Sequence, residues 1–247
     1  MKQFLENAPV NTDQKKESIY KHEEFGNLEE DACSLVRKLK DKIDQGFYDI
    51  LVSDETGGRL PTLLMRAIIK KRNPQAKIQT LFINGGKMLR DVVDDGRDEK
   101  EFESFVDYLK FVTEDHQNAL VVTQVMRSGT SVALLASMLS ESGCDHVDVA
   151  TVRARYAEPI YQEDKNRIEG EVFYGRESNY TDEFDDKNTE LSGVSKVERN
   201  VVHPSTVRNI LMEKDPEEIN KIQTVINEAR EDVNTMADRI CKEVWMD

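Results

Sequence analysis

Residues 119–131 (ALVVTQVMRSGTS) combine the residue types that bind phosphate groups in proteins. An apolar run at 119–122 leads into a loop of small and hydroxyl-bearing residues, and an apolar helical pattern begins at Val132. We therefore expect a strand, a tight loop and a helix N-terminus, where backbone N–H groups and the helix dipole attract an anion. The candidate phosphate-binding residues are Arg127, Ser128, Gly129, Thr130 and Ser131. Their hydroxyls and guanidinium add donors, and the glycine allows close backbone approach. An ordinary turn with a capping serine is the alternative.

A second segment of this kind lies about 70 residues earlier, at 53–59 (SDETGGR). It follows an apolar run at 48–52 and precedes Pro61, a residue favoured in the first turn of a helix. The glycine pair can expose successive N–H groups, and the arginine can bind a phosphate through two parallel hydrogen bonds. The candidate anion-binding residues here are Glu55, Thr56, Gly57, Gly58 and Arg59. Gly-Gly turns are common, so this segment gains weight only beside the first one.

The elements that would position both segments alternate between short apolar runs and helical patterns. Strands are expected at 48–52, 77–83, 119–122 and 146–152, and helices at 29–45, 61–72 and 102–112. This alternation predicts an α/β fold, a doubly wound and mostly parallel sheet with helices on both faces. Because ligands bind beyond the carboxyl ends of such strands, both segments should lie at one edge of the sheet.

Four segments divide the chain. Residues 1–28 are polar and expected to be irregular, 29–155 form the α/β core, 156–204 form an irregular hood or insert, and 205–247 form a helical C-terminal segment. Asp215 and Pro216 are a helix-start signal, and apolar residues then recur three and four positions apart up to Ile240. We expect this long helix to pack on its own domain. A dimerising coiled coil, and with it a homodimer, is the alternative.

The composition argues against several classes of function. The 247 residues include 48 acidic and 34 basic side chains, and the net charge of −14 argues against general binding to nucleic acids or anionic membranes. Three widely separated cysteines indicate free thiols, and the four histidines show no metal-binding spacing. The N-terminal residues lack the apolar region of a signal peptide and no run could span a bilayer, so a cytoplasmic location is expected.

The first segment resembles the phosphoribosyl pyrophosphate (PRPP) motif of type I phosphoribosyltransferases. That motif has four apolar residues, two acidic residues, two apolar residues and a small-residue loop with a central glycine and a closing Ser or Thr. The positions that fit are the apolar run, Val125, Met126, Ser128, Gly129 and Ser131. Thr123 and Gln124 occupy the two acidic positions. In the family those carboxylates bind the ribose hydroxyls, so the departure bears on catalysis more than on the fold.

The resemblance covers residues 30–155 and implies a role for each segment. Residues 127–131 would hold the 5′-phosphate of PRPP, residues 55–59 would hold its pyrophosphate with Mg²⁺ bridging the oxygens, and Thr123 and Gln124 would contact the ribose. The charged stretch 84–98 would be a flexible loop over the reacting centre. Its cation would be Lys87 or Arg90, for which simple surface charge is the alternative. The hood would stack on a nucleobase, with the candidate rings Tyr156, Phe173 and Tyr174.

Three functions agree with these features. The first is an active transferase that moves phosphoribose to a nitrogen acceptor, with the missing carboxylates supplied by Asp54, Glu55 or the acids at 91–95. The second is a catalytically degenerate protein of the same fold that binds a nucleotide or sugar phosphate as a sensor or regulator. The third is a hydrolase of a phosphorylated ligand on this scaffold. Neutral Thr and Gln bind a ribose more weakly than carboxylates, and this weighs against the first.

Overall fold

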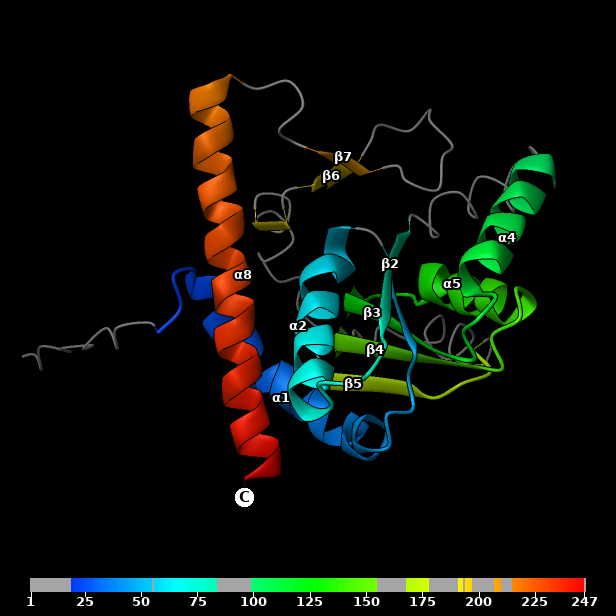
Figure 1. Ribbon diagram of the computed structural model, residues 1–247, viewed down its shortest axis with the longest axis horizontal. Helices are drawn as coiled ribbons and strands as arrows, with labels where there is room; N and C mark the ends of the chain where they lie inside the picture. Colours follow the sequence, from blue (N-terminus) through cyan, green and yellow to red (C-terminus); the bar gives the residue numbers. More distant parts are fainter. Residues whose placement is uncertain are drawn as a thin grey trace, which may run out of the picture.

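Strands and helices alternate along most of the chain in the computed structural model (Figure 1). The structure describes residues 19–54, 56–83, 99–154, 168–177, 191–192, 194–196, 207–209 and 215–246. The helices are α1 (Glu23–Asp44), α2 (Thr56–Arg72), α4 (Glu99–Thr113), α5 (Thr130–Glu141) and α8 (Pro216–Trp245). The strands are β1 (Ile50–Asp54), β2 (Gln79–Ile83), β3 (Asn118–Met126), β4 (His146–Ala154), β5 (Val172–Glu177), β6 (Val194–Lys196) and β7 (Val207–Asn209). The expected loop at 84–98 and the ring of Tyr156 lie outside the described residues.

Five parallel strands form the central sheet in the order β2-β1-β3-β4-β5. Ile50 at the start of β1 lies between Gln79 of β2 and Ala119 of β3. The predicted α/β fold with a parallel sheet is thereby confirmed. In doubly wound folds with this strand order, ligands bind where the chain changes sides of the sheet, between the first and third strands.

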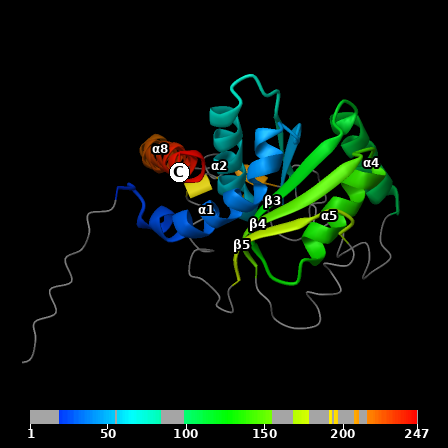
Figure 2. The same ribbon diagram turned by 90° about the horizontal axis from the view of Figure 1, so that it is seen from below.

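Helices cover both faces of the sheet (Figure 2). Helices α1, α2 and α8 lie on one face, and α4 and α5 lie on the other. Leu51 of β1 belongs to the core under the first layer, whereas its neighbours Ile50 and Val52 belong to the core under the second. Because alternate residues of a strand point to opposite faces, burial on both faces produces the continuous apolar runs seen in the sequence.

Helix α1 begins at Glu23, earlier than the apolar periodicity indicated. The expectation of an irregular segment is wrong for residues 23–28, because Phe25 and Leu28 are buried in the core. No side chain of the helix caps its start. Instead, the buried carboxylate of Asp232 on α8 accepts the N–H groups of Lys21 and His22 at 2.9 Å each. A cap supplied from so far along the chain leaves no local sequence signal.

The fifth strand is the largest difference from the sequence-based expectation. The sequence predicts an irregular hood at residues 172–177, but they form β5 and extend the sheet beside β4. Their side chains are partly exposed and Gly175 interrupts the run, so their apolar signal is weak. The expected base-stacking rings of Phe173 and Tyr174 lie here, under the ammonium groups of α1: Lys42 Nζ is 5.2 Å from the Phe173 ring centroid and Lys38 Nζ is 4.1 Å from the Tyr174 ring centroid. Phe173 packs with the core cluster under α1, whereas Tyr174 packs with the core cluster on the opposite face of the sheet.

A short antiparallel pair of strands, β6 and β7, lies outside the main sheet. Strand β6 falls within the expected hood and contacts α2, above which it is seen in Figure 1. Residues 207–209 were expected in the helical C-terminal segment, and they form β7 instead. The helix itself starts only at Pro216.

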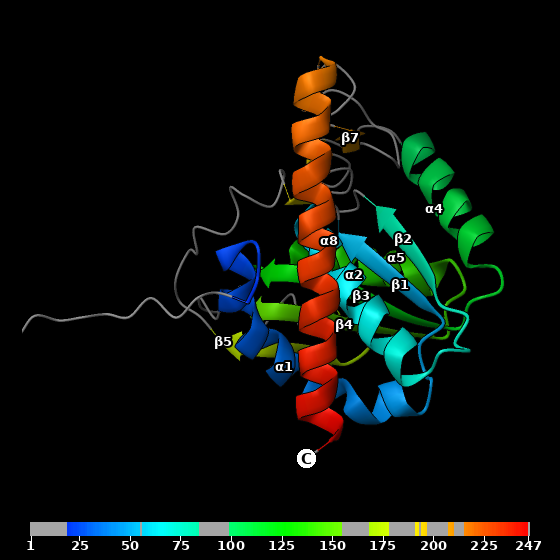
Figure 3. The same cartoon turned by 60° about the vertical axis from the view of Figure 1, so that its left-hand side comes forward.

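Helix α8 begins as its sequence predicts and packs on its own domain. The Oδ1 atom of Asp215 accepts the N–H groups of Glu217 and Glu218 at 2.9 Å each, and Pro216 is the first helical residue. The buried residues of the apolar seam lie between Ile226 and Ile240, where the helix crosses α1 and α2 (Figure 3). The preference for packing within one domain is thus confirmed for this part of the helix.

The C-terminal parts of α2 and α8 contact each other, and the two helices run in the same direction with inclined axes (Figure 3). Lys71 near the end of α2 pairs with Asp238 of α8 at 2.6 Å. The Arg72 guanidinium lies 4.7 Å from the ring centroid of Trp245, the single tryptophan. Trp245 Nε1 also donates to the carboxylate of Asp44 at 2.8 and 3.0 Å. These contacts fix the alignment of α8 along α2.

Replacing Asp232 by Asn should destabilise the fold by about 1–3 kcal/mol, because the amide NH₂ would face one of the two backbone N–H groups and leave it without an acceptor. Urea unfolding followed by Trp245 fluorescence measures this loss. Asp238→Asn is the matched control on the same helix, since Asp238 is exposed and its ion pair contributes less than about 1 kcal/mol. Equal losses in the two variants would contradict the capping role of Asp232.

Two further expectations concern cysteines and membranes. The three cysteines are free thiols, as expected, and burial raises the pKa of Cys33 and of Cys144 to about 11. Among the helices that the structure describes, none has both the length and the apolar composition needed to cross a bilayer.

Candidate functional site

The two segments singled out in the sequence meet where the chain changes sides of the sheet. Strands β1 and β3 are neighbours, and Ser53 lies opposite Val122 near the end of β1. From β1 the chain enters α2 on one face, whereas from β3 it enters α5 on the other face (Figure 2). Both helix N-termini therefore lie at the carboxyl edge of the sheet, at the point where doubly wound proteins bind ligands.

The N-terminus of α5 has the expected strand–loop–helix form. Gly129 adopts a left-handed conformation with φ of 87°, precedes the first helical residue and has no side-chain cap hydrogen bond. Its carbonyl accepts the N–H of Ala133 at 2.8 Å. The hydroxyls of Ser128 and Thr130 lie 3.1 Å apart, beside the start of the helix. Arg127 is exposed. The Ser128 hydroxyl also accepts the N–H of Thr130, the first residue of α5, at 3.4 Å. The following N–H groups of the first turn have no partner within the helix.

The N-terminus of α2 differs from the expected loop. Residues 56–59 form the first turn of the helix, so Pro61 lies inside α2 and not in its first turn. Pro61 has no N–H for the Gly57 carbonyl four residues earlier, and its ring crowds that carbonyl. The Thr62 hydroxyl donates to the next carbonyl, that of Gly58, at 2.7 Å. No described atom lies within 4 Å of a Cβ built on Gly57. Glu55 lies outside the described residues. Gly57 therefore lies at a helix N-terminus with no described atom close to the position of a Cβ.

Arg59 is a partly buried cation near the start of α2. Its guanidinium lies 4.1 Å from the ring centroid of Phe82, a residue of β2 that the sequence analysis did not single out. Its Nε atom is buried, and no described residue forms a hydrogen bond with it. Burial and then the positive charge of Arg230 on α8 lower the pKa of Arg59. A cation at a helix N-terminus is also opposed by the helix dipole, so an anion bound here would relieve three unfavourable features at once.

The charges at the helix starts divide the helices into two kinds. Helices α1 and α8 each carry two glutamates in the first turn, and an aspartate binds the N–H groups at each start. Helices α2 and α5 carry no acidic residue in the first turn. The positive ends of α2 and α5 are therefore not neutralised by carboxylates of their own first turns.

Another arginine near this edge already has its partners. Arg153, late in β4, donates from Nε to the Asp31 carboxylate at 2.5 Å and from Nη2 to the Asn27 carbonyl at 2.8 Å. Its side chain is largely buried, as is that of Asp31. This pair ties α1 to β4, whereas Arg59 has no such partner among the described residues.

The two residues expected to contact a ribose lie inside β3. The side chains of Thr123 and Gln124 are 2% and 1% exposed, because the strand continues to Met126. Thr123 pairs with Thr151 of β4, and the Thr151 hydroxyl contacts the Gln124 carbonyl at 3.4 Å. Contact between these side chains and a ligand stays a prediction, and it requires the end of the strand to open.

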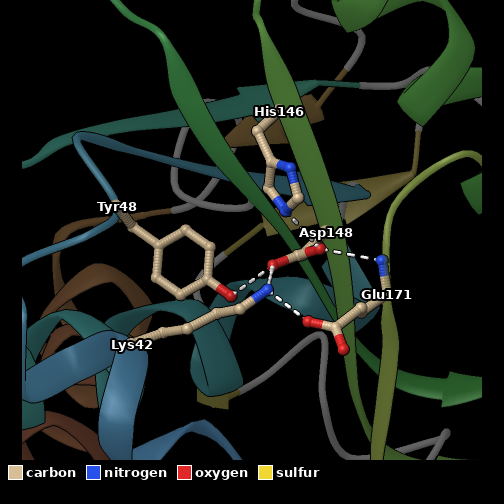
Figure 4. Close-up of polar contacts among 5 residues, drawn as sticks. All are labelled: Lys42, Tyr48, His146, Asp148 and Glu171. Carbon is tan, nitrogen blue, oxygen red and sulfur yellow. Dashed lines mark hydrogen bonds and ion pairs between the residues drawn. The ribbon is translucent and has the colours of Figure 1, made fainter.

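A second buried polar cluster lies at the opposite edge of the sheet, near the start of β4 (Figure 4). Asp148 is fully buried, and each of its oxygens accepts two hydrogen bonds. Oδ2 accepts from Lys42 Nζ and from the Tyr48 hydroxyl at 2.6 Å each. Oδ1 is 2.9 Å from His146 Nε2 and accepts the Glu171 N–H at 2.8 Å. The five residues come from α1, the turn before β1, β4 and the start of β5 (Figure 4).

The contacts within this cluster favour a charged Asp148, a charged Lys42 and a neutral Tyr48. Burial would raise the pKa of Asp148, but hydrogen bonds from Lys42, Tyr48 and the Glu171 N–H outweigh it and hold that pKa below its usual value. Burial would lower the pKa of Lys42, but its contacts with Asp148 and Glu171 raise it. Burial and the hydrogen bond to Asp148 raise the pKa of Tyr48. A carboxylate with all its acceptor sites used holds elements together, and it is not available to a ligand.

Comparison with known proteins does not extend this picture. No family model matches the chain, and no curated protein matches its sequence. Within the residues that the structure describes, no group of three or more His, Cys, Asp or Glu side chains could hold a metal ion.

Proposed function

We propose that this protein binds a phosphorylated ligand of the PRPP or nucleotide type at the carboxyl edge of its sheet, between the N-termini of α2 and α5. The observation that carries the proposal is Arg59. It is a partly buried cation near a helix N-terminus, its Nε atom is buried, and no described residue accepts a hydrogen bond from that atom. An anion provides the missing acceptor and the missing negative charge.

Each helix start has its own part in binding. At α5, the N–H groups of the first turn and the hydroxyls of Ser128, Thr130 and Ser131 bind a terminal phosphate such as the 5′-phosphate of PRPP. At α2, the N–H groups around Gly57 and the guanidinium of Arg59 bind the second phosphorylated group, the pyrophosphate of PRPP. The two starts follow neighbouring strands, so one ligand can span both.

Binding without transfer is favoured over catalysis. Transfer of phosphoribose requires stabilisation of a cationic ribose, and Thr123 and Gln124 are neutral and buried. Loss of that stabilisation costs a factor of ten in rate for each 1.4 kcal/mol or so. Among the described residues no carboxylate cluster could hold Mg²⁺, so the phosphate oxygens of the ligand would be its main ligands. A regulatory or sensing role for the bound nucleotide or sugar phosphate agrees with this site.

Arg59→Gln should weaken binding of PRPP by about 10- to 100-fold, because a hydrogen bond to a charged group contributes about 1.5–3 kcal/mol. Calorimetric titration of the full chain with PRPP and Mg²⁺ measures the change. Arg66→Gln is the matched control, since Arg66 is an exposed arginine on the same helix. We expect its affinity to equal that of the unmodified protein.

The same titration tests the proposal as a whole. The absence of binding of PRPP, AMP and ribose 5-phosphate to the unmodified protein would refute it. Equal affinities of Arg59→Gln and Arg66→Gln for PRPP would show that Arg59 at the start of α2 does not bind the ligand. Assays for released pyrophosphate, with a panel of nucleobases present, separate the two functions: release would establish the transferase, and binding without release agrees with the sensor.

A further inference from the structure

Helix α8 brings a second arginine, also without a partner among the described residues, to the candidate site. Arg230 is exposed, and no described residue forms a hydrogen bond or an ion pair with it. The residues one turn away from it on α8 are Ile226, Asn227, Val233 and Asn234, none of which is acidic. In a chain with 48 acidic side chains against 34 basic ones, two neighbouring arginines without a described carboxylate partner are unusual.

The alignment of the helices places Arg230 level with Arg59. Lys71 of α2 pairs with Asp238 of α8, and counting twelve residues back along each helix leads to Arg59 and Ile226. Arg72 of α2 lies against Trp245 of α8, and counting thirteen residues back along each helix leads to Arg59 and Asp232. Since both helices run in the same direction and rise equally per residue, Arg59 lies beside the stretch 226–232, with Arg230 inside it.

Packing of the neighbouring side chains agrees with this alignment. Leu60, next to Arg59, is buried in the same core cluster as Ala229, next to Arg230. The effect of the Arg230 charge on the pKa of Arg59 is a further sign that the two guanidinium groups lie close together. Like charges held close in this way repel each other unless an anion lies between them.

Most other charged residues of α8 are paired. The ion pairs join Lys221 to Glu217, Glu231 to Lys21, Asp238 to Lys71, Arg239 to Glu29 and Glu243 to Arg37. Among the basic residues of α8, Arg230 and Lys242 form no ion pair with a described residue. Of these two, Arg230 is the one whose charge acts on Arg59, whereas Lys242 lies near the other end of the helix.

We propose that Arg230 is a specificity-determining residue of the candidate site, and that together with Arg59 it selects a diphosphate group over a single phosphate. The inference rests on the proposed function and adds α8 to the site. A diphosphate carries two phosphoryl groups and more negative charge than one phosphate, so each arginine can bind a separate group. A single phosphate is served by the N-terminus of one helix and gains less from the second cation.

The test is a calorimetric titration of the full chain with two probes, inorganic pyrophosphate and inorganic phosphate, at low salt. Arg230→Gln should lower the affinity for pyrophosphate about tenfold, the effect of losing one charge-assisted contact. The affinity for phosphate should change about threefold or less. Arg230→Lys should recover most of the pyrophosphate affinity because it keeps the charge. Lys242→Gln removes one exposed charge from the far end of α8 and should have no effect.

The outcomes distinguish this inference from the proposed function. Pyrophosphate binding that depends on Arg59 but not on Arg230 would overturn the inference alone. Equal losses for Arg230→Gln and Lys242→Gln would also overturn it, because they would reflect net charge only. Absence of binding of pyrophosphate and PRPP to the unmodified protein would overturn both. Arg230→Lys behaving like Arg230→Gln at an unchanged melting temperature would refute the role of its charge.

Discussion

Asp148→Asn should lower the free energy of unfolding by about 3–5 kcal/mol, the cost of removing one partner of a buried ion pair. Asparagine has a single acceptor oxygen, so two of the four groups around Asp148 lose their acceptor. Lys42 loses the negative charge that holds it in place, although it keeps its contact with Glu171. Urea unfolding followed by Trp245 fluorescence measures the change.

Two comparisons show whether the loss comes from the cluster. Asp145→Asn changes an exposed aspartate three residues away and should alter stability by less than about 0.5 kcal/mol. In a double-mutant cycle, Lys42→Met combined with Asp148→Asn should cost less than the sum of the single changes, because the second change no longer breaks the pair. Strict additivity would contradict the ion pair, and a small loss in Asp148→Asn would contradict the role of the whole cluster.

The contribution of this cluster should also depend on pH in a defined direction. Folding lowers the pKa of Asp148, so its contribution is present above the unfolded pKa of about 3.9 and is lost as the pH falls through the lower folded value. Folding raises the pKa of Lys42, so that contribution is present below about pH 10.4 and is lost as the pH rises through the higher folded value. The stability difference between the unmodified protein and Asp148→Asn should therefore be constant near neutrality and shrink below about pH 4.

Gly175→Ala should destabilise the protein by about 3 kcal/mol or more, at or above the upper end of the range for overpacked sites. A Cβ at this position would lie 2.0 Å from the Asp31 carbonyl oxygen of α1 and 2.6 Å from the Val152 carbonyl oxygen of β4. Both are backbone atoms, so no side chain can rotate away. We expect α1 to move off β5 and to break the hydrogen bond from the Ser34 hydroxyl to the Gly175 carbonyl, 2.9 Å long.

Gly26→Ala is the matched control within α1. The nearest atom to a Cβ at Gly26 is Tyr20 Cδ2 at 3.9 Å, which is ordinary contact. Alanine there should stabilise the helix by up to about 1 kcal/mol, because glycine is a poor helix former. Thermal unfolding of the two variants should therefore give shifts of opposite sign. A neutral Gly175→Ala would mean that β5 does not pack as closely on α1 as described.

The elements with strong local patterns could be predicted from the sequence. Apolar runs located β1, β3 and β4 to within two to four residues at their ends, and the Asp215 cap located the start of α8. The strand–loop–helix form predicted around residues 127–131 is confirmed, whereas residues 56–59, expected in a loop, form the first turn of α2. Phosphate binding at either segment stays a prediction. The elements that the sequence predicts well are therefore those that depend on residues close together along the chain.

The features that were missed depend on contacts between distant residues. Strand β5 is an edge strand whose side chains are half exposed, so its pattern resembles a loop. The early start of α1 depends on Asp232, and the arrangement of Arg59 with Arg230 depends on the packing of two helices. Burial of Thr123 and Gln124 follows from the length of β3, which the apolar run alone understated.

The cap that Asp232 supplies to α1 has a consequence for the order in which the protein can fold. Its two hydrogen bonds join residues 211 and 210 positions apart. A ribosome adds roughly 5–20 residues per second, so α1 emerges ten seconds or more before the carboxylate that completes it. During that interval the apolar side of α1 can already meet β4 and β5, but the N–H groups of Lys21 and His22 before the helix still lack their acceptor. The domain therefore closes only after α8 has been synthesised, and a chaperone has this period in which to act on the nascent chain.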